Sequence, residues 1–501
     1  MNKNILLIGF YNEKALGVRY LYRALKESGF TPHIIYFKAF NSLVPQPSTE
    51  QELNLLREQV RKIDPLCVCL SVMSSLYLET IDKVSASLRQ EFPDLLQVWG
   101  GVFPTLEAER ALKRADLVLR GEGEDAIVEL VTALADGTDP RSIQNIAYLD
   151  DSGEYSAVDV RPIADINRFS YPPIGGANIS LINDNTLSEG DPQLRAFTYE
   201  LCASRGCPFT CSYCSSINLR RMYAHKGRYV RFRSVDSVIE ELLEAKKKLS
   251  RLRIIHFWDE IFSDEPGWVE EFSRRYKNEI KLPFRIWGHP LKTTENQIRH
   301  LVDAGLHQIV MGIQSGSENL RRDIFHRLET QEQILEASRV LAECRVPVVY
   351  YDFMICHPFE STDQLRETFE LCMELSAPFK LNIHGLNFLP STDIVRMALE
   401  RGLYTEDELE GMMYGSIQEQ YDQYWGPNAA AFRDASLSNV WVSLIYLTQF
   451  PKLHGKLRDL SERAARGEAV SEINALRVKM ERAMRRRELI DKVRLVLRVG
   501  R

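Results

Sequence analysis

Several features that would narrow the function of a protein are missing from these 501 residues. No stretch reaches the roughly 20 apolar residues that cross a bilayer, and the apolar run after Met1 is too short for a secretory signal. Nine cysteines are too few for a disulfide scaffold, and their odd number argues the same way. A net charge of −6 gives no reason to expect a nucleic-acid partner. The absences predict a cytoplasmic globular protein without a transmembrane segment.

Two nucleotide-binding fingerprints are also absent. The chain has no G-x4-G-K-[ST] loop, and no G-x-G-x-x-G sequence stands in the right place after a predicted strand. A hydrophobic fraction of 45% and a charged fraction of 26% are ordinary for folded domains. The length suggests about three domains, on a prior of roughly 100–200 residues each.

What the chain does have is a short loop with three cysteines. Cys207, Cys211 and Cys214 stand at C-x3-C-x2-C spacing after an apolar, strand-like run. Thiolates are the usual protein ligands of iron–sulfur clusters, so three of them would leave one iron of a [4Fe–4S] cluster open to a small chelating ligand. The alternative, a structural zinc site, usually takes four ligands in two pairs, and no second C-x2-C pair is evident. Cys202 lies outside the spacing and is expected to be a strand residue.

This cysteine loop resembles that of the radical S-adenosylmethionine enzymes, including the aromatic Tyr213 just before the third cysteine. In that family the open iron binds the amino and carboxylate groups of S-adenosylmethionine. One electron from the cluster then cleaves this cofactor to a 5′-deoxyadenosyl radical, which abstracts hydrogen from a substrate. The resemblance implies a [4Fe–4S] cluster, S-adenosylmethionine and an external one-electron donor such as flavodoxin or ferredoxin.

Residues 1–140 are predicted to form a parallel, doubly wound sheet, because short apolar runs alternate with helical patterns. Ligands of such sheets bind at the carboxyl ends of the strands. Turn-forming segments stand at three of these ends, at 71–75, 100–105 and 121–124. For each segment alone, a role in turning the chain is the better explanation. Strands are expected at 4–10, 33–37, 67–71, 96–99 and 116–119.

Together, segments 100–105 and 121–124 resemble the Rossmann-like cobalamin-binding domain that precedes many radical S-adenosylmethionine enzymes. The D-x-H-x-x-G motif that supplies a histidine to cobalt elsewhere is absent, and Phe103 replaces the histidine common in G-G-x-H-P-T. The resemblance thus implies cobalamin with no histidine on its lower face; the alternative is a vestigial or purely structural domain. The expected cobalamin contacts are Ser71, Met73, Ser74, Leu76, Gly100, Gly101, Phe103, Pro104, Thr105, Gly121, Glu122 and Gly123.

The remainder of the chain divides into three parts. Residues 141–195 look like a linker, because they combine a hairpin signal with polar, loop-like runs. Six strand–helix units over 196–400 match the open (β/α)6 partial barrel of the radical family, with chemistry at the strand carboxyl ends. Residues 401–501 are expected to be a helical domain, with a core helix at the apolar run 440–450. Its basic last helix is expected to pack on the protein. The alternative is that this helix contacts a membrane surface.

Polar residues at the ends of the barrel strands are candidates for the active site. The family often holds the amino group of S-adenosylmethionine where Asp259 and Glu260 stand. Gln314 and Ser315 occupy positions where an acid usually meets the ribose hydroxyls. Residues of the late strands could face the substrate, although a structural hydrogen bond explains each one equally well. These candidate catalytic residues are Tyr350, Asp352, His357 and His384.

The resemblance implies a cobalamin-dependent radical S-adenosylmethionine enzyme. The leading expectation is methylation of an unactivated carbon, through methylcobalamin and a 5′-deoxyadenosyl radical, on a small-molecule, peptide or lipid substrate. One alternative is a non-methylating cyclisation or rearrangement on the same scaffold. Another is an iron–sulfur and cobalamin sensor without catalysis.

Overall fold

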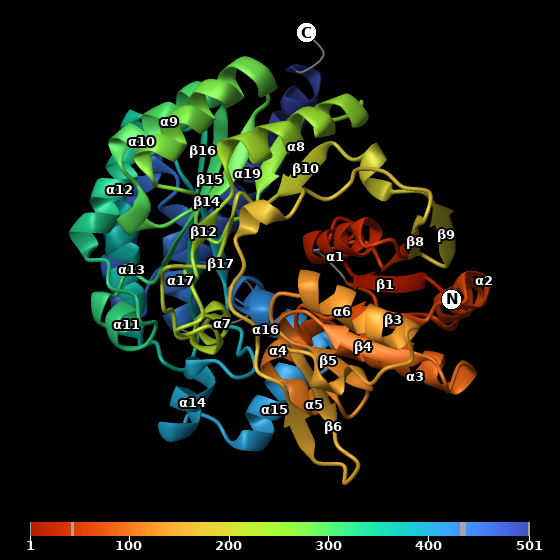
Figure 1. Cartoon of the computed structure of the whole chain (residues 1–501). Helices are drawn as coiled ribbons and strands as arrows, with labels where there is room; N and C mark the ends of the chain where they lie inside the picture. The colour runs from red at the N-terminus through yellow and green to blue at the C-terminus, as the bar shows by residue number, and fades with distance from the viewer. Residues whose placement is uncertain (1, 42–44, 431–436, 499–501) are drawn as a thin grey trace.

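The computed structural model describes residues 2–41, 45–430 and 437–498. Two bodies built on parallel sheets dominate the molecule, and C-terminal helices lie against both (Figure 1). In Figure 1 the N-terminal sheet is red and orange, and the barrel is green and teal. The predicted fold class is therefore confirmed: an N-terminal α/β domain, an open barrel and a helical C-terminal region.

The first sheet has a parallel centre. Its elements are β1 (Asn4–Phe10), α1 (Leu16–Glu27), β2 (Thr31–Phe37), α2 (Glu50–Ile63), β3 (Cys67–Ser71), α3 (Leu78–Glu91), β4 (Leu96–Gly100), α4 (Val102–Leu106), α5 (Ala108–Ala111), β5 (Leu117–Leu119) and α6 (Glu124–Ala135). β1 is buried along almost its whole length, because α1 and α6 cover one face of the sheet and α2 and α3 the other. The central strand order is β5-β4-β3-β1-β2. The winding therefore reverses between β1 and β3, where doubly wound sheets bind ligands.

The segment predicted to be a linker, 141–195, also extends this sheet. β6 (Ile146–Leu149) and β7 (Tyr155–Ala157) form an antiparallel hairpin beside β5. At the other edge β8 (Ile179–Asn183) pairs with β2 in parallel, and β9 (Thr186–Glu189) returns beside it. All four strands are short; β7 and β9 are largely exposed, as edge strands often are, whereas β6 and β8 bury apolar residues.

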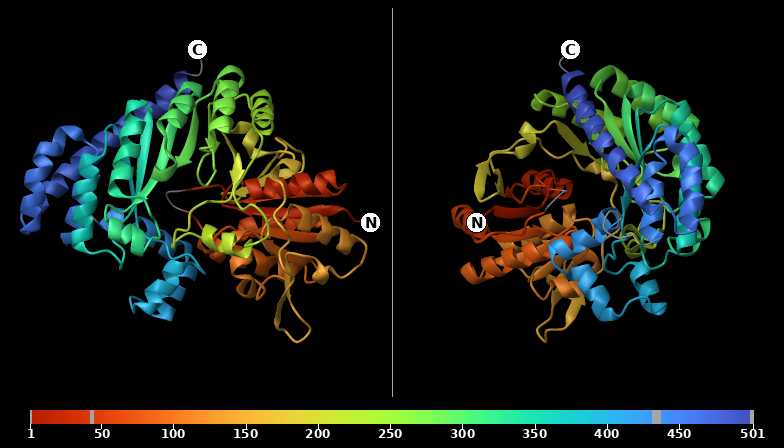
Figure 2. Two further views of the ribbon diagram at one scale, coloured as in Figure 1. Left: turned by 60° about the vertical axis from the view of Figure 1, so that its left-hand side comes forward. Right: turned by 180° about the vertical axis from the view of Figure 1, so that it is seen from behind.

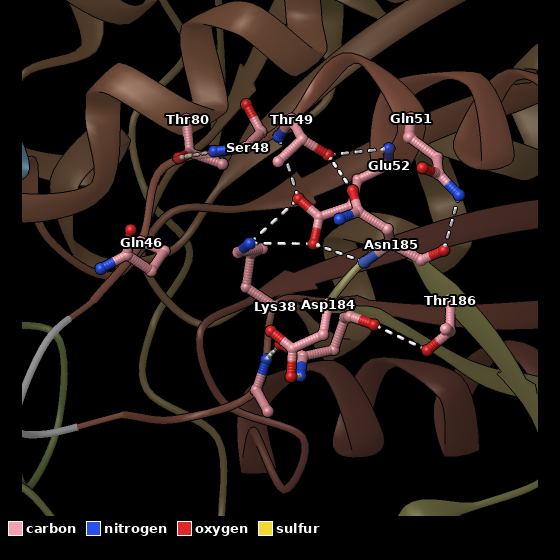
Figure 3. Close-up of polar contacts among 12 residues, drawn as sticks. Lys38, Gln46, Ser48, Thr49, Gln51, Glu52, Thr80, Asp184, Asn185 and Thr186 are labelled. Carbon is pink, nitrogen blue, oxygen red and sulfur yellow. Dashed lines mark hydrogen bonds and ion pairs between the residues drawn. The ribbon is translucent and has the colours of Figure 1, made fainter.

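A buried ion pair fastens the β8–β9 turn to the sheet (Figure 3). Lys38 follows β2, and its Nζ lies 2.9 Å from both carboxylate oxygens of Glu52 in α2. Thr49 caps α2 and forms a capping box with Glu52. The Thr49 hydroxyl also donates to the side-chain oxygen of Asn185 in the β8–β9 turn, and Gln51 Nε2 donates to the Asn185 carbonyl at 3.1 Å. One cluster thus joins a strand end, a helix start and an edge hairpin.

The barrel is a six-stranded parallel sheet in the order β10-β13-β14-β15-β16-β17. Its strands are β10 (Thr198–Leu201), β13 (Ile254–Phe257), β14 (Phe284–Gly288), β15 (Leu306–Gln314), β16 (Val348–Met354) and β17 (Lys380–His384). Its larger outer helices are α8 (Val235–Lys248), α9 (Pro266–Arg275), α10 (Glu295–Ala304), α12 (Gln331–Glu343) and α13 (Thr362–Glu374). On β14, β16 and β17, buried residues alternate with partly exposed ones. The outer side of each strand packs on helices, so the partly exposed residues face the concave side.

The C-terminal helices complete the barrel. They are α14 (Asp393–Glu400), α15 (Glu406–Tyr414), α16 (Ile417–Ala430), α17 (Leu437–Leu447), α18 (His454–Ala465) and α19 (Val470–Arg498). Trp441 and Leu444 of α17 are buried in the main barrel core, which confirms the predicted core helix. Ile473 is also buried in that core, so the start of α19 packs on the protein as expected. No described helix is both long and apolar enough to span a membrane.

α16 bridges the two sheets at the open side of the barrel. Gln420 Nε2 donates to the Ser75 carbonyl of the N-terminal domain at 3.3 Å. The amide of Gly385, directly after β17, donates to the Tyr424 carbonyl at 2.7 Å. Seen from behind in Figure 2, the light-blue helices lie between the orange domain and the barrel. The N-terminal domain and α16 together therefore cover the side that six strands leave open.

Candidate active site

A cavity of about 390 Å³ lies between the first sheet and the barrel. The first sheet contributes Ser71, Met73, Gly100, Gly101, Gly121, Glu122 and Gly123, from the ends of β3, β4 and β5. The barrel contributes Cys202, Ser204, Arg205, Gly206, Trp258 and Glu260. The ligand-binding edge of the first sheet therefore opens directly onto the segment that leads into the cysteine loop.

Glycines form the turns at the strand ends where the first sheet lines the cavity. Gly101 has φ +108°, and a Cβ there would lie 2.6 Å from the Val72 carbonyl oxygen. Gly121 has φ +72°, and a Cβ there would lie 2.1 Å from the Tyr223 hydroxyl. Both positions therefore require glycine. At these glycine turns a large flat cofactor can approach the backbone, and apolar side chains form the rest of the wall, so this cavity fits cobalamin.

Three other predicted cobalamin contacts, Phe103, Pro104 and Thr105, pack or form hydrogen bonds within the domain next to these glycine turns. α4 begins directly after Gly101, and its first turn buries Phe103 and Pro104 in the core, with the Phe103 ring 6.3 Å from that of Tyr414. The Thr105 hydroxyl donates to the Gly101 carbonyl at 2.7 Å and accepts from the Gly121 amide at 2.9 Å. Thr105 therefore ties the Gly101 and Gly121 turns together, and contacts of these three residues with cobalamin stay a prediction. Ser74 likewise caps the amide of half-buried Leu76, at 3.2 Å.

An ion-pair cluster joins the Gly121–Glu124 segment to the cysteine loop. Arg205 Nη2 donates to Glu124 Oε1 at 2.5 Å, and Arg205 Nη1 lies 3.6 Å from Glu122. Arg231 donates twice to Glu122, and the Tyr223 hydroxyl accepts from the Glu122 amide at 2.7 Å. Burial alone would raise the pKa of Glu124, but the charge of Arg205 holds it below its usual value. This Arg205 cluster fixes the two loops relative to each other.

Cys207, Cys211 and Cys214 are half-buried on the loop between β11 (Ser204–Arg205) and α7 (Ser216–Met222), and all are free thiols. Burial raises the pKa of Cys207 and Cys214 to about 12, so their thiolates need a positive partner. Within the described ranges, no three His, Cys, Asp or Glu side chains converge on a single ion position. In an iron–sulfur cluster each thiolate binds its own iron, so the loop fits a [4Fe–4S] cluster.

Arg327 is the site residue that the sequence did not indicate. Its Nη1 lies 3.9 Å from Cys211 Sγ and 3.3 Å from the Tyr213 hydroxyl. Its Nε donates to Glu329 at 2.6 Å, and its Nη2 donates to the Gly312 carbonyl at 2.7 Å. The side chain thus places a cation beside the cysteine loop and ties that loop to β15. Arg327 stands in no recognisable motif, so only the fold reveals this contact.

The four candidate residues for binding S-adenosylmethionine fall into two pairs, according to whether their side chains already have hydrogen-bond partners. Asp259 is buried, accepts from the Ala203 amide at 3.1 Å and from the Ser204 hydroxyl, and its pKa is raised to about 6 by burial. Ser315 is also engaged internally, because its hydroxyl accepts from the Ser317 amide at 3.1 Å.

In contrast, Glu260 opens into the cavity, where desolvation raises its pKa. Gln314 ends β15 at φ +74°, and its buried Oε1 has no hydrogen-bond partner among the described residues. Glu260 and Gln314 are therefore the pair with unused capacity for a ligand.

Three of the four candidate catalytic residues lie on the concave side of the late strands. Asp352 accepts from Asn382 at 2.7 Å, and burial raises its pKa to about 6. Tyr350 is partly exposed on the same strand, and the His384 ring stacks on Tyr424 of α16 at 4.7 Å.

His357 differs from these three. Its ring lies 5.3 Å from that of Phe325 and 6.1 Å from that of Phe359, and burial lowers its pKa to about 3. Neither ring nitrogen has a partner in the part of the chain that the structure describes. After β16 the chain packs this side chain against the two aromatic rings, and its role at the substrate stays a prediction.

Comparison with known proteins identifies both halves of the site. The model of the radical SAM superfamily matches residues 201–372, and that of the B12-binding domain matches residues 10–131. The barrel with its cysteine loop and the doubly wound domain thus define a radical S-adenosylmethionine protein with a second cofactor domain. The chain belongs to the cobalamin-binding-domain-containing radical S-adenosylmethionine enzymes, and its cofactors are a [4Fe–4S] cluster, S-adenosylmethionine and cobalamin.

Relatives of different activity match the chain. Anaerobic magnesium-protoporphyrin IX monomethyl ester cyclase of Cereibacter sphaeroides is 25% identical over 373 residues, which cover 71% of this chain and 56% of that protein. An uncharacterised methyltransferase of Pyrococcus horikoshii is 25% identical over 326 residues, covering 64% of this chain and 66% of that protein. The chain thus spans little more than half the length of the cyclase.

Two solved structures share the fold. TsrM of Kitasatospora setae, a radical S-adenosylmethionine methyltransferase solved with tryptophan substrate and an S-adenosylmethionine analogue, superposes with a TM-score of 0.65 at 17% identity. The match covers 80% of this chain and 76% of TsrM. The cobalamin-dependent radical enzyme OxsB gives a TM-score of 0.64 at 16% identity, covering 100% of this chain and 81% of OxsB. At these identities the likeness shows the fold alone.

Proposed function

We propose that this enzyme methylates an unactivated carbon of a small-molecule substrate. The observation that carries the proposal is the single cavity lined both by the glycine loops of the B12-binding domain and by the segment entering the cysteine loop. When bound, the cofactors supply a methyl group, a 5′-deoxyadenosyl radical and the electron that generates it. A shared cavity lets the substrate carbon meet the radical source and the methyl source without leaving the enzyme.

The residues of the chain have separate roles in this proposal. Cys207, Cys211 and Cys214 hold the cluster, while Glu260 and Gln314 bind S-adenosylmethionine through an amino group and ribose hydroxyls. No histidine is among the described residues that line the cavity, which supports cobalamin held without a histidine below cobalt.

A non-methylating radical reaction is the second candidate. It is favoured by the similarity to the magnesium-protoporphyrin cyclase and to 4′-phospho-dehydrooxetanocin synthase of Priestia megaterium, which is 23% identical over 386 residues. Cyclisation would use the same cavity and the same cluster but would leave the methyl group of S-adenosylmethionine untouched.

Isotope labelling separates the two candidates. The anaerobically reconstituted enzyme would be incubated with methyl-deuterated S-adenosylmethionine, a chemical reductant and small-molecule extracts, and products would be identified by mass spectrometry. Methylation predicts a product that carries the labelled methyl group, with both 5′-deoxyadenosine and S-adenosylhomocysteine formed. A product without label, accompanied by 5′-deoxyadenosine alone, would replace the proposal by the cyclisation.

A further inference from the structure

The concave face of the barrel carries an arginine that forms no direct ion pair with the described residues. Arg285 is the second residue of β14 and occupies a partly exposed, inward-facing position. It forms no hydrogen bond or ion pair with the described residues, and its Nε is buried without a partner. Desolvation lowers its pKa, and the nearby Tyr350 and Glu200 offset this effect only in part.

The neighbouring acidic groups are already engaged. In the register of the sheet, Glu200 of β10 lies beside His256 of β13, and His256 lies beside Arg285 of β14. Glu200 accepts from Lys14 Nζ at 2.9 Å through one oxygen and from Trp258 Nε1 at 2.8 Å through the other. Burial lowers the pKa of His256 to about 4, so this ring is neutral at pH 7.

The other carboxylate on the concave face lies on β16. Asp352 accepts from Asn382 at 2.7 Å, and no carboxylate of the described residues lies within ion-pair distance of Arg285. Arg285 is therefore left without a direct ion-pair partner on this face. Leaving a desolvated charge unpaired is costly, and an anionic ligand would recover that cost.

An aromatic surface stands next to this charge. Trp287 follows Arg285 by two residues, so both side chains project from the same face of β14. The Trp287 ring lies 5.9 Å from that of Trp258 at an interplanar angle of 29°. Trp258 is 44% exposed and also lines the cofactor cavity. The indole pair thus connects Arg285 with the cavity.

We propose that this face binds the substrate, with an anionic group on Arg285 and a planar ring against Trp258 and Trp287. The substrate class is a small planar organic anion, whose charge is a carboxylate or a phosphate. The inference rests on the proposed function, because it assigns a substrate to the same site. A ring on the indole pair lies beside the cofactor cavity while its anionic end reaches toward Arg285.

Matched fragments test the charge requirement. Calorimetric titration of the cofactor-loaded enzyme would compare benzoate and phenyl phosphate with the neutral benzamide. We expect at least one anion to bind about tenfold more tightly than benzamide, which is the effect of one charge-assisted hydrogen bond. The anion that binds more tightly identifies carboxylate or phosphate as the natural group.

Three variants connect the preference to this face. Arg285→Gln should abolish the difference between anion and amide, and Arg285→Lys should retain part of it. Trp287→Leu should weaken all three fragments alike. Arg299→Gln, which removes an exposed arginine of α10 paired with Glu295, should change nothing. Absorption spectra of the loaded variants verify that cluster and cobalamin are present.

Chemical modification of arginine tests the role of Arg285 in anion binding without a substitution. Phenylglyoxal should modify Arg285 in the loaded wild-type enzyme, and the preferred anion should block this modification where benzamide does not. Equal binding of anion and amide, absence of binding by every fragment, or a preference that survives in Arg285→Gln would overturn the inference. Loss of label transfer in the methylation assay, with the anion preference intact, would count against the proposed function alone.

Discussion

Single residues decide whether the cluster can form. Serine in place of Cys207, Cys211 or Cys214 should remove most bound iron and sulfide, because each thiolate holds a different iron. Cys202→Ser is the matched control: this thiol lies one residue after β10 and lines the cavity without belonging to the spacing. Iron content and the visible absorption of anaerobically reconstituted protein measure the effect. Retention of the full cluster in any of the first three variants would contradict the assignment.

One buried carboxyl group should make stability depend on pH. Glu360 accepts from the Cys356 amide at 2.8 Å, and burial raises its pKa from 4.5 to about 8. The folded state therefore holds this proton more tightly than the unfolded state. The contribution of Glu360 to stability is fully present below pH 4.5 and is lost as the pH rises through 8.

Glu360→Gln provides the matched comparison for this effect. Relative to this variant, the wild type should lose up to roughly 1.4 kcal/mol of unfolding free energy per pH unit within that window. Urea unfolding of both proteins between pH 5 and pH 8 measures the difference, and groups common to both cancel. A difference that stays constant across the window would show that Glu360 is ionised in the folded protein.

At this scale the sequence was informative where function depends on local chain chemistry. The cysteine spacing and the glycines at 100, 101 and 121 could be read directly, because ligand identity and backbone freedom belong to the residue itself. Phe103 and His357 were predicted as ligand-site residues, and the structure buries both side chains, that of Phe103 within an apolar core of the first sheet. Their direction is set by where α4 begins and where β16 ends, which no short pattern encodes.

Among the structural elements, the contact between the loop after β5 and the loop after β10 should be energetically important. Arg205→Gln leaves Glu124 buried without its cation, and breaking such a pair costs about 3–5 kcal/mol. Arg168→Gln is the matched control, because its partner Asp125 lies next to Glu124 but the arginine side chain is 49% exposed. That change should cost under about 1 kcal/mol.

Thermal unfolding and cobalamin affinity measure this prediction. Arg205→Gln should lower both the unfolding midpoint and the affinity for cobalamin, because Glu124 lines the cavity. Equal midpoints in the two variants would mean that the Arg205 cluster contributes no stability.

Element prediction succeeded for strands with strong apolar character. The five central strands of the first sheet and the six of the barrel are buried on at least one side, so their composition identified them. The hairpin of β6 and β7 was predicted, but β8 and β9 were not, because both are short and β9 is almost wholly exposed. Their assignment to the first sheet depends on pairing between distant parts of the chain.

At the scale of the whole molecule, the barrel should depend on the C-terminal helices. A chain ending at residue 430 lacks Trp441, Leu444 and Ile473, which are buried in the barrel core. We expect it to expose that core and aggregate. A chain ending at residue 486 keeps all three residues and should remain monodisperse. Soluble yield and size-exclusion chromatography distinguish the two, and similar behaviour of both chains would refute the dependence.

The placement of α17 also has a consequence for biosynthesis. The first sheet has all its strands once residue 189 has left the ribosome, so it can close early during translation. The barrel strands end at residue 384, but their apolar core waits for α17 and for Ile473. Nascent barrel strands are therefore exposed over about ninety further codons, a period of several seconds at roughly 5–20 residues per second. Overexpression hosts rich in chaperones, and slow induction at low temperature, should accordingly improve recovery of this enzyme.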